Sequence, residues 1–245
     1  MMNAVRTGRV IVMDGAMGTQ LQARGLDFAR ESTCDWNFSH PDDVRAVHRS
    51  YVEAGAEVLV TNTFLATDTE TRQRGIELAR AELPSGGWLL LDIGPTRGLP
   101  RSAIEARAAL ADLPPFDGIL LETFSDVEAL TIAEAFAGCD VPVVLSITFR
   151  RINGVIRSFD DNEPEFFARH AKDSGVSILG VNCGRDMSID AVAEVVRRYR
   201  TTTDLPLMAR PNVEAFAGLI EAGATLIGGC CGTTPDFIRR ISHLS

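Results

Sequence analysis

Three cysteines stand beside glycines in two short motifs, and together they offer three sulfur ligands. The motifs are Asn182-Cys183-Gly184 and Gly229-Cys230-Cys231-Gly232. A catalytic zinc site keeps three protein ligands and leaves the fourth position for water or substrate. If that fourth ligand is a thiol, the metal can hold it as a thiolate, the form that attacks carbon. The cysteines therefore predict a metal ion that takes part in chemistry.

The sequence also allows two other interpretations of these cysteines. Cys183 alone is compatible with a buried cysteine that acts as a small hydrophobic residue, and Cys230 and Cys231 with a strained redox-active bridge. The surrounding glycines favour the metal. Consecutive strand residues point to opposite faces, so both neighbours can bind one ion only if the backbone bends sharply, which glycine permits.

Composition and charge narrow the class of protein. The chain has 245 residues, of which 45% are apolar, and a formal net charge of −9. This charge argues against nucleic acid or an anionic membrane as the main partner. Five cysteines, an odd number without a small disulfide-scaffold pattern, fit a reducing compartment. Residues 1–12 contain no apolar stretch long enough for a signal peptide or a membrane span, so we expect a cytoplasmic protein.

Eight short apolar runs alternate with amphipathic stretches, which is typical of strands alternating with helices. The runs are residues 10–13, 58–61, 88–93, 118–121, 141–149, 177–182, 205–209 and 225–227. The amphipathic stretches are residues 41–54, 67–83, 103–111, 126–137, 164–174, 189–200, 213–222 and 235–241. This order predicts a single α/β domain over residues 1–245, a (β/α)8 TIM barrel. The alternative, an open doubly wound sheet, lacks a GxGxxG motif after the first run.

Polar residues stand at the ends of the predicted strands, where barrel enzymes carry their functional groups. Cys183 ends the sixth run and Cys230 and Cys231 follow the eighth, so groups from these two strands can converge on one metal. The four histidines fall in helices or loops, where we interpret them as exposed or helix-surface residues, and the predicted site is sulfur-only. The polar residues at strand ends are Asp14, Thr61, Asn62, Thr63, Asp92, Glu122, Thr123, Ser146, Thr148, Asn182 and Asn212.

Five motifs resemble the zinc-dependent homocysteine S-methyltransferase family. This family includes the homocysteine-binding module of cobalamin-dependent methionine synthase and betaine-homocysteine methyltransferase. The resemblance extends from about residue 9 to residue 240 and implies a (β/α)8 barrel that transfers a methyl group to homocysteine, giving methionine. It also implies that Cys183, Cys230 and Cys231 bind zinc as the catalytic centre. The motifs are Asp14-Gly15-Ala16-Met17-Gly18-Thr19, Asn62-Thr63-Phe64, Glu122-Thr123, Asn182-Cys183-Gly184 and Gly228-Gly229-Cys230-Cys231-Gly232-Thr233-Thr234-Pro235.

The same resemblance suggests roles for the substrate-binding residues. Zinc would take the homocysteine sulfur as its fourth ligand, lower its pKa and leave it nucleophilic. Glu122, together with Asp14, would receive the ammonium group, although Asp14 also fits a residue that caps the turn after it. Backbone N–H groups of Gly15, Ala16 and Met17 would cradle the carboxylate. Asn62 and Thr63 would shape the pocket.

The methyl donor is left open by the sequence. Segments 64–88 and 212–225 are shorter than is usual in the family, Val213-Glu214 stands where a glycine commonly follows, and Asp92 replaces a small polar residue. A small sulfonium donor needs no partner, whereas a folate or corrinoid cofactor would arrive on another protein. One alternative function is therefore a homocysteine-binding subunit that takes the methyl group from a separate corrinoid or other carrier protein. A second is a barrel lyase with structural or redox-sensitive cysteines.

Overall fold

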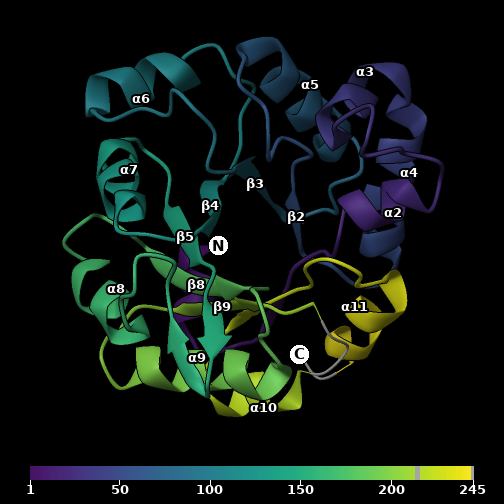
Figure 1. Cartoon of the computed structure of the whole chain (residues 1–245). Helices are drawn as coiled ribbons and strands as arrows, with labels where there is room; N and C mark the ends of the chain where they lie inside the picture. Colours follow the sequence, from purple (N-terminus) through teal and green to yellow (C-terminus); the bar gives the residue numbers. More distant parts are fainter. Residues whose placement is uncertain (213–215, 244–245) are drawn as a thin grey trace.

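Eight strands lie side by side in parallel and curl into a barrel (Figure 1). In the computed structural model, which describes residues 1–212 and 216–243, the order around the barrel is β1-β10-β9-β8-β5-β4-β3-β2. A parallel bridge from Met13 to Val58 joins β1 to β2 and nearly closes the barrel. The strands are β1 (Ile11–Val12), β2 (Val58–Val60), β3 (Trp88–Ile93), β4 (Gly118–Phe124), β5 (Val143–Ile147), β8 (Ile178–Asn182), β9 (Leu207–Arg210) and β10 (Leu226–Ile227). The predicted (β/α)8 barrel is confirmed.

Helices connect successive barrel strands and cover the outside of the sheet (Figure 1). Side chains of Asp68, Ser102 and Ser188 accept backbone N–H groups at the starts of α5, α6 and α9, which explains where these helices begin. The helix predicted over 213–222 begins outside the described residues, and its described part is α10. The helices are α4 (Pro41–Glu53), α5 (Thr69–Arg80), α6 (Ala103–Leu110), α7 (Glu128–Ala137), α8 (Pro164–His170), α9 (Ile189–Arg200), α10 (Ala217–Glu221) and α11 (Pro235–Ser242).

Alternate residues of the strands fill the barrel interior. Ile11 and Met13 pack inward, whereas Val12 between them packs outward against the helices. A helix that the sequence reasoning missed, α1 (Met2–Arg6), places Val5 in the same inner cluster, against which Trp88 at the start of β3 also packs. It therefore covers the N-terminal end of the barrel. The other inward residues are Val58, Val60, Leu90, Leu120, Val144, Ile178, Met208 and Leu226.

A hairpin that the sequence reasoning also missed follows β5. Strands β6 (Arg150–Ile152) and β7 (Val155–Arg157) pair antiparallel, and the turn between them is Asn153-Gly154. Both turn residues have positive φ, 51° and 82°, which is the conformation that Asn-Gly favours in two-residue hairpins. The apolar run predicted over 141–149 is consequently longer than β5.

Three short helical segments lie between β1 and α4: α2 (Gly18–Gln22), a 3₁₀-helix (Thr33–Asp35) and α3 (Trp36–Ser39). They are too short to give a helical period in the sequence. Residues of the first two line the cavity described below. Within residues 1–212 and 216–243, the helices lack the combined length and hydropathy that a membrane span requires.

Candidate metal and substrate site

Residues from the C-terminal ends of the strands surround a cavity of about 800 Å³. Asp14, Asp92 and Glu122 line it together with the three cysteines predicted to bind metal. Gly15, Ala16, Met17 and Asn62 also line it, whereas Thr63 does not. The structure thus brings most of the predicted site residues to one volume, and their roles stay predictions.

The three sulfurs converge at this cavity from two strands. Cys183 follows β8, and Cys230 and Cys231 follow β10. The Sγ atoms of Cys183 and Cys230 are 3.1 Å apart, those of Cys230 and Cys231 are 3.9 Å apart, and all three lie within 4.8 Å of one another. The thiols are free, because a disulfide bond is about 2.05 Å long.

Glycines beside the cysteines leave room for neighbouring groups. A Cβ atom on Gly184 would lie 2.0 Å from the carbonyl oxygen of Phe149, and one on Gly229 would lie 2.1 Å from Oγ1 of Thr233. The Cys230 N–H donates to the carbonyl of Pro211 at 2.8 Å, and the hydroxyl of Thr148 donates to the carbonyl of Cys183 at 2.5 Å. Close approach of backbones therefore fixes the cysteines. After Cys231 the backbone turns at Gly232, whose φ of 79° lies in the left-handed region that glycine adopts without strain.

The ionisation of the three thiols is coupled. Hydrogen bonding to Cys230 and then to Cys231 raises the pKa of Cys183, because its proton is held between sulfurs. The same contacts, from Cys183 first and then from Cys230, lower the pKa of the exposed Cys231 to about 3. Without a cation, three neighbouring thiolates would repel one another. Three soft sulfur donors in so small a volume fit zinc, which pairs with thiolates and leaves one position for a further ligand.

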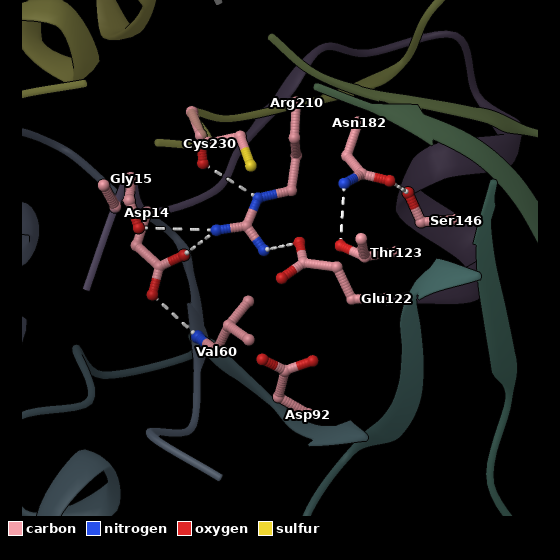
Figure 2. Close-up of polar contacts among 12 residues, drawn as sticks. Asp14, Gly15, Val60, Asp92, Glu122, Thr123, Ser146, Asn182, Arg210 and Cys230 are labelled. Carbon is pink, nitrogen blue, oxygen red and sulfur yellow. Dashed lines mark hydrogen bonds and ion pairs between the residues drawn. The ribbon is translucent and has the colours of Figure 1, made fainter. Parts of the chain in front are cut away.

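An arginine missed by the sequence reasoning holds the acidic side of the cavity together (Figure 2). Arg210, the last residue of β9, has a side chain that is only 5% exposed. Its Nη1 donates to Oε1 of Glu122 at 2.8 Å, and its Nη2 donates to Oδ1 of Asp14 at 3.2 Å. Its Nε donates to the carbonyl of Gly229 at 3.0 Å, next to Cys230. The ammonium expected at Glu122 and Asp14 would therefore share these carboxylates with a guanidinium.

Burial governs the pKa values of this cluster. It raises the pKa of Asp14 to about 7, although Arg210 and the N–H of Val60, at 2.8 Å from Oδ2, oppose the shift. Burial also raises the pKa of Glu122, again against the attraction of Arg210. For Arg210 itself, burial lowers the pKa, but the carboxylates of Glu122 and Asp14 outweigh burial and raise it. Arg210 is therefore charged and compensates one negative charge of the pair.

The turn after β1 is tied to the loop that carries Cys230. The N–H of Ala16 donates to Oγ1 of Thr233 at 3.1 Å, and the Tyr51 hydroxyl donates to the carbonyl of Ala16 at 2.8 Å. Of the three N–H groups predicted to cradle a carboxylate, that of Ala16 is thus already engaged. In the part of the chain that the structure describes, those of Gly15 and Met17 have no acceptor and line the cavity.

Asn62 and Thr63 hold neighbouring segments in place. The Asn62 amide donates to the carbonyl of Thr33 at 2.7 Å and to Oδ1 of Asn37 at 2.9 Å, which anchors the segment between β1 and α4. The Thr63 hydroxyl donates to the carbonyl of Asp92 at 2.7 Å. Asn62 thus contributes to the wall of the cavity, and Thr63 acts on the backbone behind it.

A polar chain links the strands beside Cys183 (Figure 2). The hydroxyl of Ser146 donates to Oδ1 of Asn182 at 2.9 Å, and Nδ2 of Asn182 donates to Oγ1 of Thr123 at 2.8 Å. Thr123 has a φ of 65°, a conformation that a β-branched residue rarely adopts. These contacts fix the position of Glu122, which precedes Thr123 and faces the cavity.

The chain matches the homocysteine S-methyltransferase family over residues 11–86 and 101–244. It is 30% identical to methionine synthase of Mycobacterium tuberculosis, in an alignment that covers 97% of this chain and 25% of that protein. It is 27% identical to homocysteine S-methyltransferase of Escherichia coli, covering 96% of this chain and 95% of that protein.

Its structure is also similar to the metallated form of the Escherichia coli homocysteine methyltransferase MmuM. The TM-score is 0.76 with 25% identity, and 96% of each chain is covered. The chain spans about a quarter of the methionine synthases that it matches and nearly the full length of the Escherichia coli enzyme. The sequence match and the barrel agree with the resemblance carried by the motifs, and the chain belongs to the homocysteine S-methyltransferase family.

Proposed function

We propose that this chain transfers a methyl group to the thiol of homocysteine, forming methionine, with a zinc ion held by Cys183, Cys230 and Cys231. The observation that carries the proposal is the convergence of three free sulfurs within 4.8 Å at the mouth of a barrel of this family. When bound, zinc supplies a Lewis acid that keeps the substrate sulfur ionised at neutral pH.

Side chains around the cavity would position the amino acid end of the substrate. Glu122 would accept the ammonium, and Arg210 favours the ionised forms of Glu122 and Asp14 against burial, which raises their pKa values. The free N–H groups of Gly15 and Met17 would donate to the carboxylate. The sulfur then forms a bond to the methyl carbon as the bond between methyl and donor breaks, and the leaving group keeps the electron pair.

The test is an assay of purified, metal-analysed protein with homocysteine and a panel of methyl donors. We expect about one zinc per chain, and methionine detected by mass spectrometry with at least one small sulfonium donor. Chelation should abolish turnover, and added zinc should restore it. Full activity in chelated protein would contradict the zinc mechanism. Absence of both bound zinc and methionine formation would favour the lyase with structural or redox-sensitive cysteines.

A second candidate is a homocysteine-binding subunit that receives the methyl group from a separate corrinoid or other carrier protein. It is favoured by the match to methionine synthases, of which this chain spans about a quarter. Phe28 and Leu65, at 52% and 50% exposure, lie on the rim of the cavity and offer apolar contacts to a carrier. In this case small methyl donors should give no methionine, and methionine should form only when a methylated carrier protein is added.

We further propose that residues 1–245 act as one homocysteine-binding domain in the cytoplasm. The support is that the five cysteines are free, three of them in one cluster, because such thiols persist in a reducing compartment. Limited proteolysis of the zinc-loaded protein should leave the barrel intact. Detection of stable disulfides in protein isolated from its native cell would contradict the assignment of compartment.

A further inference from the structure

Asp92 is a buried carboxylate at the cavity, and the proposed function assigns no role to it. It is the fifth residue of β3 and is 5% exposed. Its Oδ1 atom is shielded from solvent and has no hydrogen-bond partner among residues 1–212 and 216–243. Of the buried side-chain atoms without a partner in the described part of the chain, only this one belongs to a residue that lines the cavity.

The surrounding residues fix the backbone of Asp92 but not its carboxylate. The N–H of Asp92 donates to Oγ1 of Thr61 at 3.0 Å, and its carbonyl accepts from Thr63. The contacts of the Arg210 guanidinium go to Glu122, to Asp14 and to backbone carbonyls, and within residues 1–212 and 216–243 none goes to Asp92. Figure 2 shows Asp92 below Glu122, and no hydrogen bond or ion pair is drawn to the Asp92 carboxylate.

The charge balance of the cavity points to a missing cation. Three buried carboxyl groups, those of Asp14, Asp92 and Glu122, face a single guanidinium, and burial raises the pKa of each, so Arg210 alone does not hold all three ionised. A buried carboxylate is costly unless it is paired and hydrogen-bonded. Within residues 1–212 and 216–243, the second oxygen of Glu122, Oε2, makes no hydrogen bond either. Glu122 and Asp92 thus offer carboxylate oxygens to one incoming group.

We propose that Asp92 and Oε2 of Glu122 together receive the α-ammonium of the amino acid thiol, which makes Asp92 a specificity-determining residue. The inference rests on the proposed function and assigns part of the substrate recognition to a residue outside the family-like motifs. An ammonium carries three N–H donors and can satisfy oxygens on two sides. A sulfonium centre carries a positive charge but no N–H group, so the charged sulfur of a donor cannot supply the missing hydrogen bond at Asp92.

The test compares homocysteine with 4-mercaptobutyrate, which has the same thiol and carboxylate but no ammonium. Asp92→Asn keeps the shape of the side chain and removes its charge. We expect the KM for homocysteine to rise about tenfold or more, as for loss of a charged hydrogen bond, with a smaller change in kcat. The KM for 4-mercaptobutyrate should stay the same or fall. Equal changes for both thiols, or no change for homocysteine, would overturn the proposal.

A binding measurement keeps this test independent of the methyl donor. Calorimetry on zinc-loaded protein gives the Kd of each thiol, and the same selective loss is expected for Asp92→Asn. Asp204→Asn removes an equal charge from the surface, where Asp204 pairs with Lys172, and should leave both Kd values unchanged. If the wild type binds homocysteine more tightly than 4-mercaptobutyrate but makes no methionine, the proposed function fails and the role of Asp92 is still decided by the variant.

Discussion

Arg210 at the end of β9 and Glu122 in β4 meet across the mouth of the barrel, with Nη1 2.8 Å from Oε1. The guanidinium also reaches Asp14, so residues from two strands and from the turn after β1 share one buried ion network. This contact places a fixed positive charge beside the sulfurs and beside the carboxylates expected to bind an ammonium. The structure therefore makes Arg210 part of the candidate site.

Arg210→Met should destabilise the protein by about 3–5 kcal/mol at neutral pH, because it leaves two buried carboxylates without their counter-charge. The loss should be smaller near pH 5.5 than near pH 8. In the variant, loss of the guanidinium raises the folded-state pKa of each carboxylate further above its unfolded-state pKa. The free energy of unfolding therefore falls as pH rises from the unfolded-state pKa towards the folded-state pKa. Urea unfolding of the wild type and the variant at pH 5.5 and pH 8 measures the loss of stability. Addition of Asp14→Asn to the variant should recover part of the loss, and an equal cost at both pH values would contradict this account.

Cys183→Ala should abolish zinc binding and turnover but leave the barrel folded, since the strands and helices bury a large apolar core without the metal. Metal analysis and circular dichroism test the two parts separately. Cys139→Ala is the matched control, because Cys139 lies outside the sulfur cluster, and it should retain zinc. Activity in Cys183→Ala would end the three-sulfur proposal.

Glu122→Gln should mainly weaken the binding of homocysteine. A glutamine oxygen can still accept from Arg210, so the fold is retained, but the charge offered to the ammonium is lost. We expect a rise in KM of about tenfold with a smaller change in kcat. Steady-state kinetics at saturating methyl donor measures both. Unchanged KM would show that the ammonium binds elsewhere in the cavity.

The fold and the sulfur cluster were predictable from sequence because their signals are local. Each apolar run became a strand, and the positions of Cys183, Cys230 and Cys231 after two such strands sufficed to bring them together. The rule that found Glu122 applies equally to Arg210, which directly follows the run over 205–209. It was missed because polar and acidic residues were considered at strand ends and a basic residue was not.

Three other features, the helix α1, the hairpin after β5 and the burial of His48, were missed or misjudged for different reasons. The packing of α1 beneath the barrel rests on contacts of Val5 with residues from distant strands. The hairpin after β5 did have a local signal, Asn153-Gly154, within an apolar and basic segment. His48 was interpreted as a surface or exposed residue, and this was wrong: it is fully buried, because α4 turns it towards the interior.

Gly184→Ala should displace Cys183 and reduce zinc affinity. The new Cβ would lie 2.0 Å from the carbonyl oxygen of Phe149, so one of the two backbones must move. We expect a loss of stability of about 1–3 kcal/mol, as for an overpacked core, and a measurable drop in zinc affinity in a chelator competition assay. For Gly218→Ala in α10, the new Cβ meets no atom within 4 Å in the described part of the chain, apart from its chain neighbours and the backbone of its own helix, and the variant should bind zinc as the wild type does. Equal zinc affinity in both variants would show that Cys183 tolerates the shift.

His48→Leu should make the metal-free protein less sensitive to acid. Both ring nitrogens of His48 are buried and have no hydrogen-bond partner among residues 1–212 and 216–243, and burial lowers its pKa from 6.5 to about 4. Because the folded-state pKa is depressed, the unfolded chain takes up a proton first as pH falls from about 6.5 towards 4, and stability is lost over this window. Between about pH 7.5 and pH 5 this group alone accounts for a loss of about 2 kcal/mol. Urea unfolding in chelator at both pH values should show a smaller loss in His48→Leu, whereas His170→Leu, at an exposed histidine, should lose as much as the wild type. An unchanged loss in His48→Leu would assign the acid sensitivity to other groups.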